Sequence, residues 1–458
     1  MGPPPLLRST WAVSGIAMAL AAVLLLSNGG NGPPSGIILT DEGGGGSIVV
    51  GDLDRDSRPE IVVLDGTGVR SFSDVDHRGI AHYAKVATVI TRTSHLAPSD
   101  VDGDGDLDLY GANGALISSG TALRTTGQYR GGWWMGDLDG DARPDRVDLL
   151  GGNLSIDLTN IAGGSQSTVL QVGEEPRKVD VEQVDGLGGP DVLVLNGPAK
   201  KAASATAPQS GLPIDPSQLF SRGATAGDNI TVLALLPSEV GQGGWARFDC
   251  PVGADPVDMG VGDFDGDKLQ DLISLNRGAG TLTVRHGSVV GAVPTNPLDL
   301  LGAGKCLPFP GVVHQQTLSG AVALAVGDID GDTFTDVATL FQPFADPDLV
   351  AQRLIESNVE VWYGSNGSLD LIPGPTIRIP GAATDVALAD LSGDGAPELV
   401  VLTATALVVV PNDGTGHFEQ PKGPLTLAQL HLAVVGAGLC AVALVVYASA
   451  PRVRRRRA

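Results

Sequence analysis

The chain has 458 residues, among them 64 Gly and 31 Pro, and only 18% of its residues are charged. This composition favours many short strands joined by tight turns and argues against a protein built of long helices. The formal net charge of -23 repels the phosphates of nucleic acids, so no nucleic acid partner is expected.

The N-terminal segment is apolar. Arg8 is followed by an uncharged run from Trp11 to Leu26 and then by a stretch rich in Gly, Pro and Asn. A basic residue before an apolar run of this length is typical of a signal peptide. The region from Ser27 to Gly30 is a poor match to a cleavage site, so an uncleaved anchor stays open. We expect residues 1–30 to be a signal peptide or an N-terminal anchor that leaves the following chain outside the membrane.

A nine-residue acidic pattern recurs along the middle of the sequence. Written once, it is D-x-D-G-D-x-x-x-D/E followed by an apolar run. Six copies are well kept, and a seventh, which begins at Gln183, has lost carboxylates. The copies start roughly 37 to 80 residues apart, which is the scale of one propeller blade. The copies occupy residues 52–60, 100–108, 137–145, 183–191, 263–271, 328–336 and 390–398.

The spacing of the acidic residues predicts a calcium site in each well-kept copy. Carboxylates at positions 1, 3 and 5 of a tight loop can converge on one point, and a fourth at position 9 closes the cage. Calcium takes about six to eight oxygen ligands in loose geometry, whereas transition metals favour nitrogen or sulfur. Gly at position 4 lets the chain turn. An EF-hand is excluded because it needs Glu at position 12, where this chain has Val63, Gly111 or Ser274.

Short apolar runs follow the loops and predict buried strands. Turn signals such as Asn366-Gly367 separate further strand-like runs, so each unit is expected to be a small meander. One such sheet cannot bury both of its faces, whereas a closed ring of sheets can. We therefore predict an all-β, seven-bladed propeller over residues 31–424. The long interval from Gln183 to Asp263 leaves an eighth blade open. The clearest runs are Ile61–Leu64, Val192–Leu195, Leu272–Leu275 and Leu399–Leu402.

Other features bear on chemistry. Residues 197–225 are rich in Ala, Ser and Pro and predict a flexible insertion. Cys250 and Cys306 could form a bridge or remain free buried thiols, while Cys440 lies inside an apolar run. The seven His residues show no metal-ligating spacing, so we expect them at the surface or in hairpins. The sequence has no nucleophile elbow and no phosphate-loop motif, and we expect no enzymatic activity.

The C-terminal end predicts a transmembrane helix. Leu430 to Ala450 carries no charge over a length of about 20 residues, which is enough to cross a bilayer. An Arg-rich tail follows Pro451, and the positive-inside rule places this tail in the cytoplasm. We expect a helix over residues 428–450, a basic cytoplasmic tail over 451–458 and a cell-membrane protein with one span, or two if the N-terminal anchor is kept.

The seven loops and the N-D-G-T-G-H-F hairpin at Asn412 to Phe418 resemble the FG-GAP and VCBS repeat proteins, the class that includes the N-terminal propeller of integrin α-subunits. The resemblance covers about residues 36–420. It implies a seven-bladed propeller whose loops lie between the inner strands of each blade and bind calcium on one face, while ligands usually meet the opposite face. The literal FG and GAP elements are not evident, so integrin-type ligand binding is not implied.

The resemblance also implies which residues are calcium ligands, at about six structural sites. The copy at Gln183, Asp185, Leu187 and Asp191 has lost two carboxylates and would be an empty or weak site. In the first three loops the ligands would be Asp52, Asp54, Asp56 and Glu60; Asp100, Asp102, Asp104 and Asp108; and Asp137, Asp139, Asp141 and Asp145. In the last three they would be Asp263, Asp265, Asp267 and Asp271; Asp328, Asp330, Asp332 and Asp336; and Asp390, Ser392, Asp394 and Glu398.

Together these features predict a membrane-anchored, extracytoplasmic surface module that binds an unknown protein or glycan, for instance in adhesion. Calcium would neutralise repulsion among the carboxylates and fix each turn, so that folding and metal binding are coupled. Two alternatives stay open. One is an enzyme on the same scaffold that acts on polysaccharide as a lyase or hydrolase, and the other is a structural module of a larger envelope assembly.

Overall fold

The computed structural model describes the middle of the chain, within the unit Ser35–Pro421. The predicted signal or anchor, the predicted transmembrane helix, the basic tail and nearly all of the predicted insertion lie outside the described residues. Within the described part, no helix has the length and apolar character needed to cross a bilayer. The described residues are 37–39, 46–53, 55–65, 68–72, 86–87, 96–102, 104, 106–111, 114–119, 122–126, 132–159, 164–173, 175–184, 186, 189–198, 228–235, 245–288, 306, 309, 311–317, 320–342, 356–404 and 406–418.

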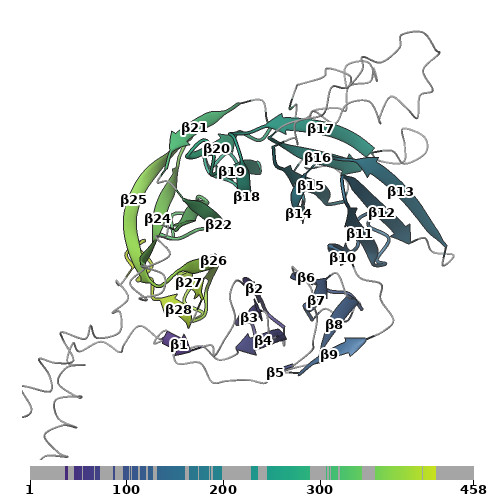
Figure 1. Cartoon of the computed structure of the whole chain (residues 1–458), viewed down its shortest axis with the longest axis horizontal. Helices are drawn as coiled ribbons and strands as arrows, with labels where there is room; N and C mark the ends of the chain where they lie inside the picture. Colours follow the sequence, from purple (N-terminus) through teal and green to yellow (C-terminus); the bar gives the residue numbers. More distant parts are fainter. Residues whose placement is uncertain are drawn as a thin grey trace, which may run out of the picture. The chain divides into compact units, whose positions relative to one another are not determined.

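The described residues form seven four-stranded antiparallel sheets, which we number as blades in chain order (Figure 1). Blades 1 to 3 comprise β2 (Ser47–Gly51), β3 (Glu60–Asp65), β4 (Gly68–Phe72) and β5 (Val86–Ala87); β6 (Leu96–Ser99), β7 (Asp108–Gly111), β8 (Gly114–Ser119) and β9 (Ala122–Thr126); and β10 (Trp134–Gly136), β11 (Asp145–Leu150), β12 (Asn153–Thr159) and β13 (Ser165–Gln171). Blades 4 and 5 comprise β14 (Pro176–Glu182), β15 (Asp191–Asn196), β16 (Asn229–Leu235) and β17 (Trp245–Pro251); and β18 (Pro256–Gly262), β19 (Asp271–Asn276), β20 (Thr281–Arg285) and β21 (Val313–Gln316). Blades 6 and 7 comprise β22 (Ala321–Gly327), β23 (Asp336–Phe341), β24 (Glu356–Ser365) and β25 (Ser368–Pro380); and β26 (Ala383–Ala389), β27 (Glu398–Thr403), β28 (Ala406–Val410) and β1 (Ile37–Leu39).

The sheets close into a ring. The innermost strands β2, β6, β10, β14, β18, β22 and β26 contact one another in this order, and β26 contacts β2 again. The outer strand of blade 7 is β1, which comes from the N-terminal end and pairs with β28, with Ile38 opposite Leu407 (Figure 1). The predicted all-β, seven-bladed propeller is therefore confirmed. No eighth sheet occurs among the described residues, because the long interval between the fourth and fifth loops holds β15 to β18 and one long connection.

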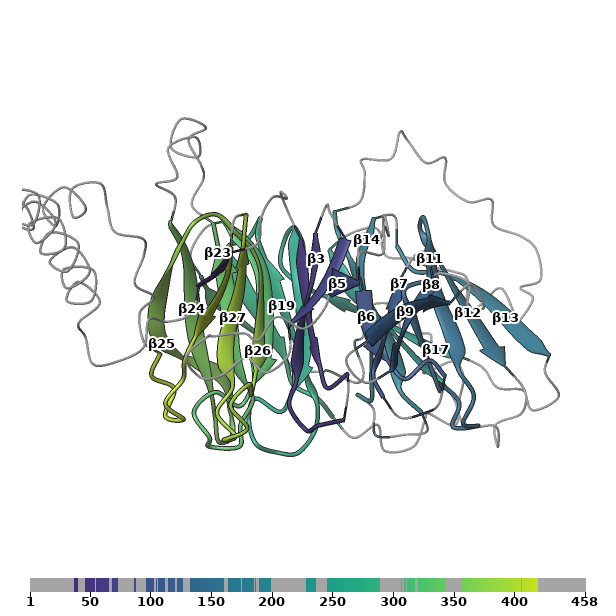
Figure 2. The same ribbon diagram turned by 90° about the horizontal axis from the view of Figure 1, so that it is seen from below.

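The apolar core lies between the blades, which stand side by side in Figure 2. Seven clusters of buried residues are formed, one between each pair of neighbouring sheets. In the cluster between blades 7 and 1, for example, Ile61 and Phe72 pack with Leu391 and Val409. The apolar runs predicted as buried strands lie in β3, β15, β19 and β27 and are buried. Each blade thus buries both faces of its sheet against its neighbours, as the ring argument requires.

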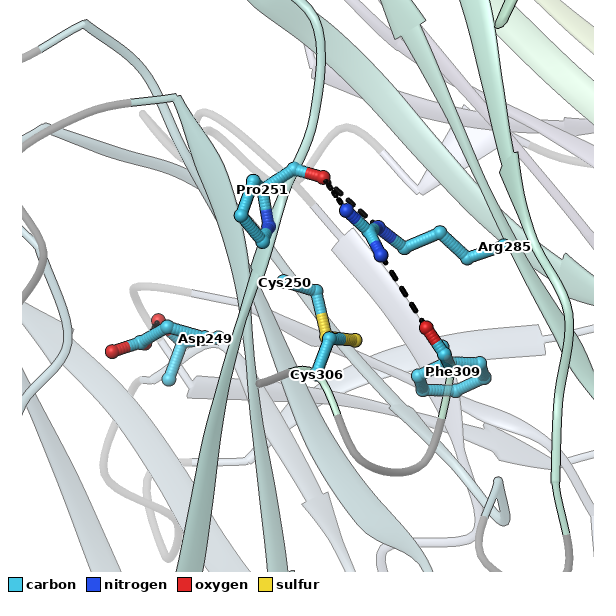
Figure 3. Close-up of a disulfide and its surroundings, with 7 residues drawn as sticks. Asp249, Cys250, Pro251, Arg285, Cys306 and Phe309 are labelled. Atoms are coloured by element: carbon cyan, nitrogen blue, oxygen red, sulfur yellow. Dashed lines mark hydrogen bonds between the residues drawn. A yellow bond between two sulfur atoms is a disulfide. The ribbon is translucent and has the colours of Figure 1, made fainter. Parts of the chain in front are cut away.

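A disulfide fastens blade 4 to blade 5. Cys250 in β17 is bonded to Cys306, which lies in the connection between β20 and β21, and their Cα atoms are 4.7 Å apart (Figure 3). Arg285 runs beside this bridge. Its Nε donates to the carbonyl oxygen of Pro251 at 2.9 Å, and its Nη1 donates to that of Phe309 at 3.3 Å. The bridge that the sequence left open is therefore formed, and a buried guanidinium supports both of its flanks.

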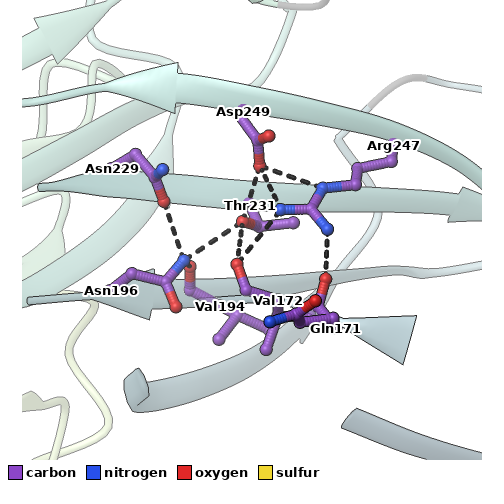
Figure 4. A network of polar contacts seen from close by, with 8 residues as sticks. All are labelled: Gln171, Val172, Val194, Asn196, Asn229, Thr231, Arg247 and Asp249. Carbon is purple, nitrogen blue, oxygen red and sulfur yellow. Dashed lines mark hydrogen bonds and ion pairs between the residues drawn. The ribbon is translucent and has the colours of Figure 1, made fainter. Parts of the chain in front are cut away.

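A polar network joins blade 3 to blade 4 (Figure 4). Asp249 accepts hydrogen bonds from the Thr231 hydroxyl at 2.8 Å and from Arg247 Nη2 at 2.9 Å. Arg247 also donates to the main-chain carbonyl of Val172, which follows the outer strand of blade 3, at 3.1 Å. The side-chain amide of Asn196 donates to Thr231 Oγ1 at 3.1 Å. Most of these polar groups satisfy one another, although the Asn196 Oδ1 atom is shielded from solvent and makes no hydrogen bond.

Candidate metal centre

Each acidic loop joins the innermost strand of its blade to the second strand. Position 1 comes directly after the first strand, and position 9 is the first residue of the second strand. The seven loops are the same connection in seven blades, so they lie at the same end of the ring. Neighbouring loops can therefore touch, as Arg55 of the first loop does when its Nε pairs with Asp106 in the second loop at 2.6 Å.

The ninth residue of the loop is buried and ties the loop to its blade. In blade 6, Asp336 Oδ2 accepts from the N–H of Ile329, at position 2, at 2.7 Å, and its Oδ1 accepts from the N–H of Gly364, on the third strand, at 2.8 Å. The position-2 bond is present in all seven loops. The sequence predicted only a ligand role at position 9, and this hydrogen-bonding role was missed. The residues concerned are Glu60, Asp108, Asp145, Asp191, Asp271, Asp336 and Glu398.

Burial raises the pKa of these ninth carboxyl groups. The pKa of Asp108, Asp145 and Asp271 rises to about 6, and that of Asp336 to about 7. Desolvation is the largest cause in each case, and the nearby loop carboxylates add to it, while the two main-chain N–H donors oppose it. The pKa of Glu398 is also raised by burial. Without a cation, closing these loops therefore places repelling charges in a poorly solvated site.

The first residue of the loop organises the turn. In blade 5, Asp263 Oδ1 accepts from the N–H of Gly266 at 2.7 Å, and its Oδ2 accepts from that of Lys268 at 2.9 Å. Both donors have a left-handed backbone, with φ of 78° for Gly266 and 69° for Lys268. Glycine at position 4 meets this need without a Cβ, as predicted. The left-handed conformation at position 6 was not predicted, because the loops place Ser57, Ala142, Lys268 or Thr333 there.

Four loops bring three carboxylates together. In each group, one ligand atom from each residue lies within 4.8 Å of the other two. Positions 1, 3 and 9 converge in blades 2 and 3, and positions 1, 3 and 5 converge in blades 5 and 6. Four predicted ligands of these loops, Asp104, Asp141, Asp271 and Asp336, are in none of these carboxylate groups. The groups are Asp100, Asp102 and Asp108; Asp137, Asp139 and Asp145; Asp263, Asp265 and Asp267; and Asp328, Asp330 and Asp332.

The two loops with Glu at position 9 form no such group among the described residues, and Asp54 of the first lies outside them. Each nevertheless holds a shielded oxygen that makes no hydrogen bond. These atoms are Asp52 Oδ1 at position 1 and Ser392 Oγ at position 3. A buried oxygen without a partner is unfavourable unless another group satisfies it. Oxygen donors of this kind fit calcium, which binds carboxylates, hydroxyls and carbonyls in loose geometry.

In the degenerate fourth loop, the side-chain amide of Gln183 forms hydrogen bonds with the main chain of the same loop. Asp185 and Leu187 lie outside the described residues. Gln183, at position 1, accepts from the N–H of Gly186 at 3.1 Å and donates from Nε2 to the carbonyl of Gly189 at 2.9 Å. An amide supplies both a donor and an acceptor, whereas a carboxylate only accepts. This loop therefore keeps its turn with fewer negative charges than the others.

One histidine lies beside a loop, although sequence reasoning placed all seven at the surface or in hairpins. His286 is half-buried, and its Nδ1 lies 3.1 Å from Asp265 Oδ2 and 3.5 Å from Asp271 Oδ1. The sequence did not indicate this contact, because His286 is distant in sequence from the loop and reaches it through strand pairing. It comes directly after β20, which pairs with β19 so that Arg285 lies opposite Leu272. The signal available in the sequence was a histidine directly after the second strand-like run that follows a loop.

Comparisons with known proteins assign the chain to no family. No protein-family model matches it, and no curated protein sequence matches it. Among solved structures, a lectin from Agrocybe aegerita that recognises non-reducing terminal N-acetylglucosamine is similar, with 14% identity, a TM-score of 0.43, and 85% of this chain and 93% of the lectin covered. A Lactobacillus plantarum protein has 11% identity and a TM-score of 0.40, with coverage of 82% and 94%. A candidate gluconolactonase has 11% identity and a TM-score of 0.34, with coverage of 85% and 96%. At these scores we draw no functional conclusion from them.

Proposed function

We propose that this chain is a calcium-binding propeller held outside a membrane, where it acts as a binding or adhesion module. The observation that carries the proposal is the repeated convergence of three carboxylates in the same connection of four blades. Like charges held this closely repel one another, and a divalent cation removes the repulsion. Calcium would be structural in this role, because its ligands and the main-chain N–H donors account for the loop oxygens.

The family assignment is part of the proposal. The D-x-D-G-D pattern is shared with FG-GAP and VCBS repeats, and its place between the first and second strands of each blade agrees with what that resemblance implies. The hairpin at Asn412 to Phe418 adds support. Its Asn412 side chain donates to the carbonyl of Ile329 in the sixth loop at 2.7 Å, so this turn packs on a neighbouring acidic loop.

Membrane attachment rests on the sequence of the two ends. The uncharged run from Leu430 to Ala450 and the Arg-rich tail that follows predict a span with the tail in the cytoplasm. The propeller precedes this span in the chain and would lie on the other side of the membrane. An extracytoplasmic setting agrees with the Cys250–Cys306 disulfide, since disulfides persist in oxidising compartments.

The ionisable side chains of the inner strands favour a binding role over catalysis. On the described inner strands we find one group of such side chains that converge, and its members hold neighbouring blades together. Lys178 Nζ donates to Asp258 Oδ1 at 2.6 Å and to the carbonyl of Met259 at 3.0 Å. Asp258 and Asp385 in turn accept from main-chain N–H groups of the next blade. The pKa of Lys178 is raised, mainly because Asp258 and Asp180 oppose the effect of burial, so the amine stays protonated and is a poor base. These groups fasten blades together.

The test uses the full chain purified in detergent. The purified protein would be applied to a glycan array and used in pull-downs of candidate surface proteins, once in calcium and once in EDTA. We expect saturable binding of a protein or glycan ligand that is lost in EDTA and restored by calcium. Turnover of a polysaccharide by the wild-type chain, or ligand binding that is the same in EDTA, would contradict the proposal. A matched variant, Asp370→Ala, changes an exposed acidic residue outside the loops and should bind as the wild type does.

A further inference from the structure

His286 adds a nitrogen donor to the loop at 263–271. Besides the contacts of Nδ1 with Asp265 and Asp271, its Nε2 lies 3.6 Å from Asp267 Oδ2. One ligand atom from each of Asp265, Asp271 and His286 lies within 4.8 Å of the other two. Asp265 also belongs to the oxygen-only group with Asp263 and Asp267. This loop therefore holds a mixed donor set next to the carboxylate set that recurs in other blades.

The Nδ1 atom of His286 faces two carboxylates of the loop. It is shielded from solvent and makes no hydrogen bond, even though Asp265 Oδ2 is near. The main chain at His286 is held next to the loop, because the His286 N–H donates to the carbonyl of Gly311 at 3.2 Å, and the next N–H, of Gly287, donates to Asp271 Oδ1. A shielded ring nitrogen that faces two carboxylates and lacks a hydrogen bond is placed as a metal ligand would be.

The equivalent position in other blades carries no such donor. The residue across from position 9 follows the last paired residue of the third strand, and strand register identifies it in blades 2, 3 and 6. It is Ile117 in blade 2, Leu158 in blade 3 and Tyr363 in blade 6, and the Tyr363 hydroxyl already donates to the carbonyl of Gly416 at 2.8 Å. The imidazole therefore distinguishes the loop of blade 5 from these three.

We propose that His286 Nδ1, Asp265 Oδ2 and Asp271 Oδ1 bind a borderline divalent cation of the zinc class. Imidazole nitrogen is a preferred ligand of zinc and related metals, whereas calcium prefers oxygen alone. The distances also suit a shared ion, because two ligands about 2.0 to 2.2 Å from zinc lie roughly 3.3 Å apart in a tetrahedral site. Solvent or another loop oxygen would complete the coordination. The site goes beyond the proposed function and does not depend on calcium in the other loops.

The test is a metal count on the full chain. The protein is stripped with chelator, dialysed against zinc with calcium in excess, and analysed by mass spectrometry for both metals. We expect about one zinc per wild-type chain. In His286→Phe, zinc affinity should fall by at least about tenfold while the calcium count does not fall. The control His417→Phe changes an exposed histidine beside the single carboxylate of Asp413 and should keep the zinc.

Two outcomes would overturn the site: a wild-type chain that holds no zinc when calcium is in excess, or a folded His286→Phe variant that keeps it. A third outcome also contradicts the zinc site. If the wild type holds no zinc and His286→Phe binds one more calcium ion than the wild type, the imidazole occupies the place of a cation and does not bind one. His286→Asn gives the same readout with a smaller polar side chain, and circular dichroism shows which variants are folded. Zinc binding without any calcium binding would contradict the proposed function and leave this inference standing.

Discussion

Asp385 of blade 7 accepts a hydrogen bond from the main-chain N–H of Ile48 in blade 1, with 2.7 Å between Oδ2 and N. This bond joins the last inner strand to the first. Asp258 makes the corresponding bond from blade 5 to the N–H of Leu324 in blade 6, at 2.9 Å. Both aspartates follow an irregularity in the pairing of their strand with the next one. Polar side chains of the inner strands therefore fasten neighbouring blades, in addition to the apolar clusters between them.

Removing the Asp385 carboxylate should weaken ring closure. Asp385→Ala leaves the N–H groups of Ile48 and Val386 without their acceptor, and an unsatisfied partly buried donor costs about 1 to 3 kcal/mol. We expect the free energy of unfolding to fall by about that amount in urea titrations of the full chain. Asp370→Ala, in an exposed position of β25, should change it by less than about 0.5 kcal/mol. Equal stability of the two variants would show that the hydrogen bond between Asp385 and Ile48 contributes nothing to the stability of the closed ring.

The same residue gives a pH dependence. Burial, opposed by the Ile48 N–H and reinforced by Asp258, raises the pKa of Asp385 from 3.8 to about 6. A raised folded-state pKa means that the folded state binds the proton more tightly, so this contribution to stability is fully present below 3.8 and is lost as the pH rises to about 6. Asp385→Asn does not titrate. Between pH 4 and pH 7 the stability of the wild type should therefore fall relative to Asp385→Asn, by at most about 3 kcal/mol. A constant difference across this range would contradict the raised pKa.

The disulfide should contribute strongly to stability. Cys250 and Cys306 are separated by 56 residues, and closing a loop of that length in the unfolded chain predicts a stabilisation of about 4 kcal/mol. Because the bridge joins blades 4 and 5, its loss should also loosen the connection between β20 and β21. Cys250→Ser with Cys306→Ser is expected to lower the melting temperature, and a reducing agent should lower that of the wild type only. If reduction leaves the wild-type melting temperature unchanged, the bridge has no such role.

In blade 6, the hydrogen bonding of the acidic loop to the main chain can be separated from its proposed calcium binding. Asp336 satisfies the buried N–H groups of Ile329 and Gly364, so Asp336→Ala should destabilise the chain by about 3 kcal/mol with or without calcium. Asp332 is exposed and accepts a hydrogen bond from the N–H of Phe334, a local group of the same turn. Asp332→Asn should therefore destabilise the chain with calcium present and have little effect in EDTA. Thermal unfolding of both variants in the two buffers checks this, and a similar loss for Asp332→Asn in EDTA would contradict it.

The repeated loop predicted the fold because local and global requirements agree in it. The pattern marks the turn between the first two strands, and the apolar run after it, such as Leu272–Leu275, needs a neighbouring sheet on each face. The number of blades and the buried second strands followed from that. The contribution of β1 to blade 7 did not, because three residues at the far end of the chain carry no acidic loop to mark them.

Parts of the site depended on contacts that no local pattern reveals. Position 9 was identified as a ligand from its charge, but its bonds to main-chain N–H groups appear only when the third strand is in place, as for Asp336 and Gly364. Lys268 and Thr333 have a left-handed backbone, and the cost of this conformation is offset by hydrogen bonds from their N–H groups to the first aspartate of the loop. Their residue types therefore did not indicate this conformation. His286 reaches its loop only through strand register.

The most direct test of the account is the calcium content of the chain together with its thermal stability. The full chain would be freed of metal, dialysed against buffered calcium and analysed for bound ions, with melting curves recorded in calcium and in EDTA. Six well-kept loops predict about six calcium ions per chain and a melting temperature that is clearly lower in EDTA. A folded chain that binds no calcium and melts at the same temperature in EDTA would contradict the central claim.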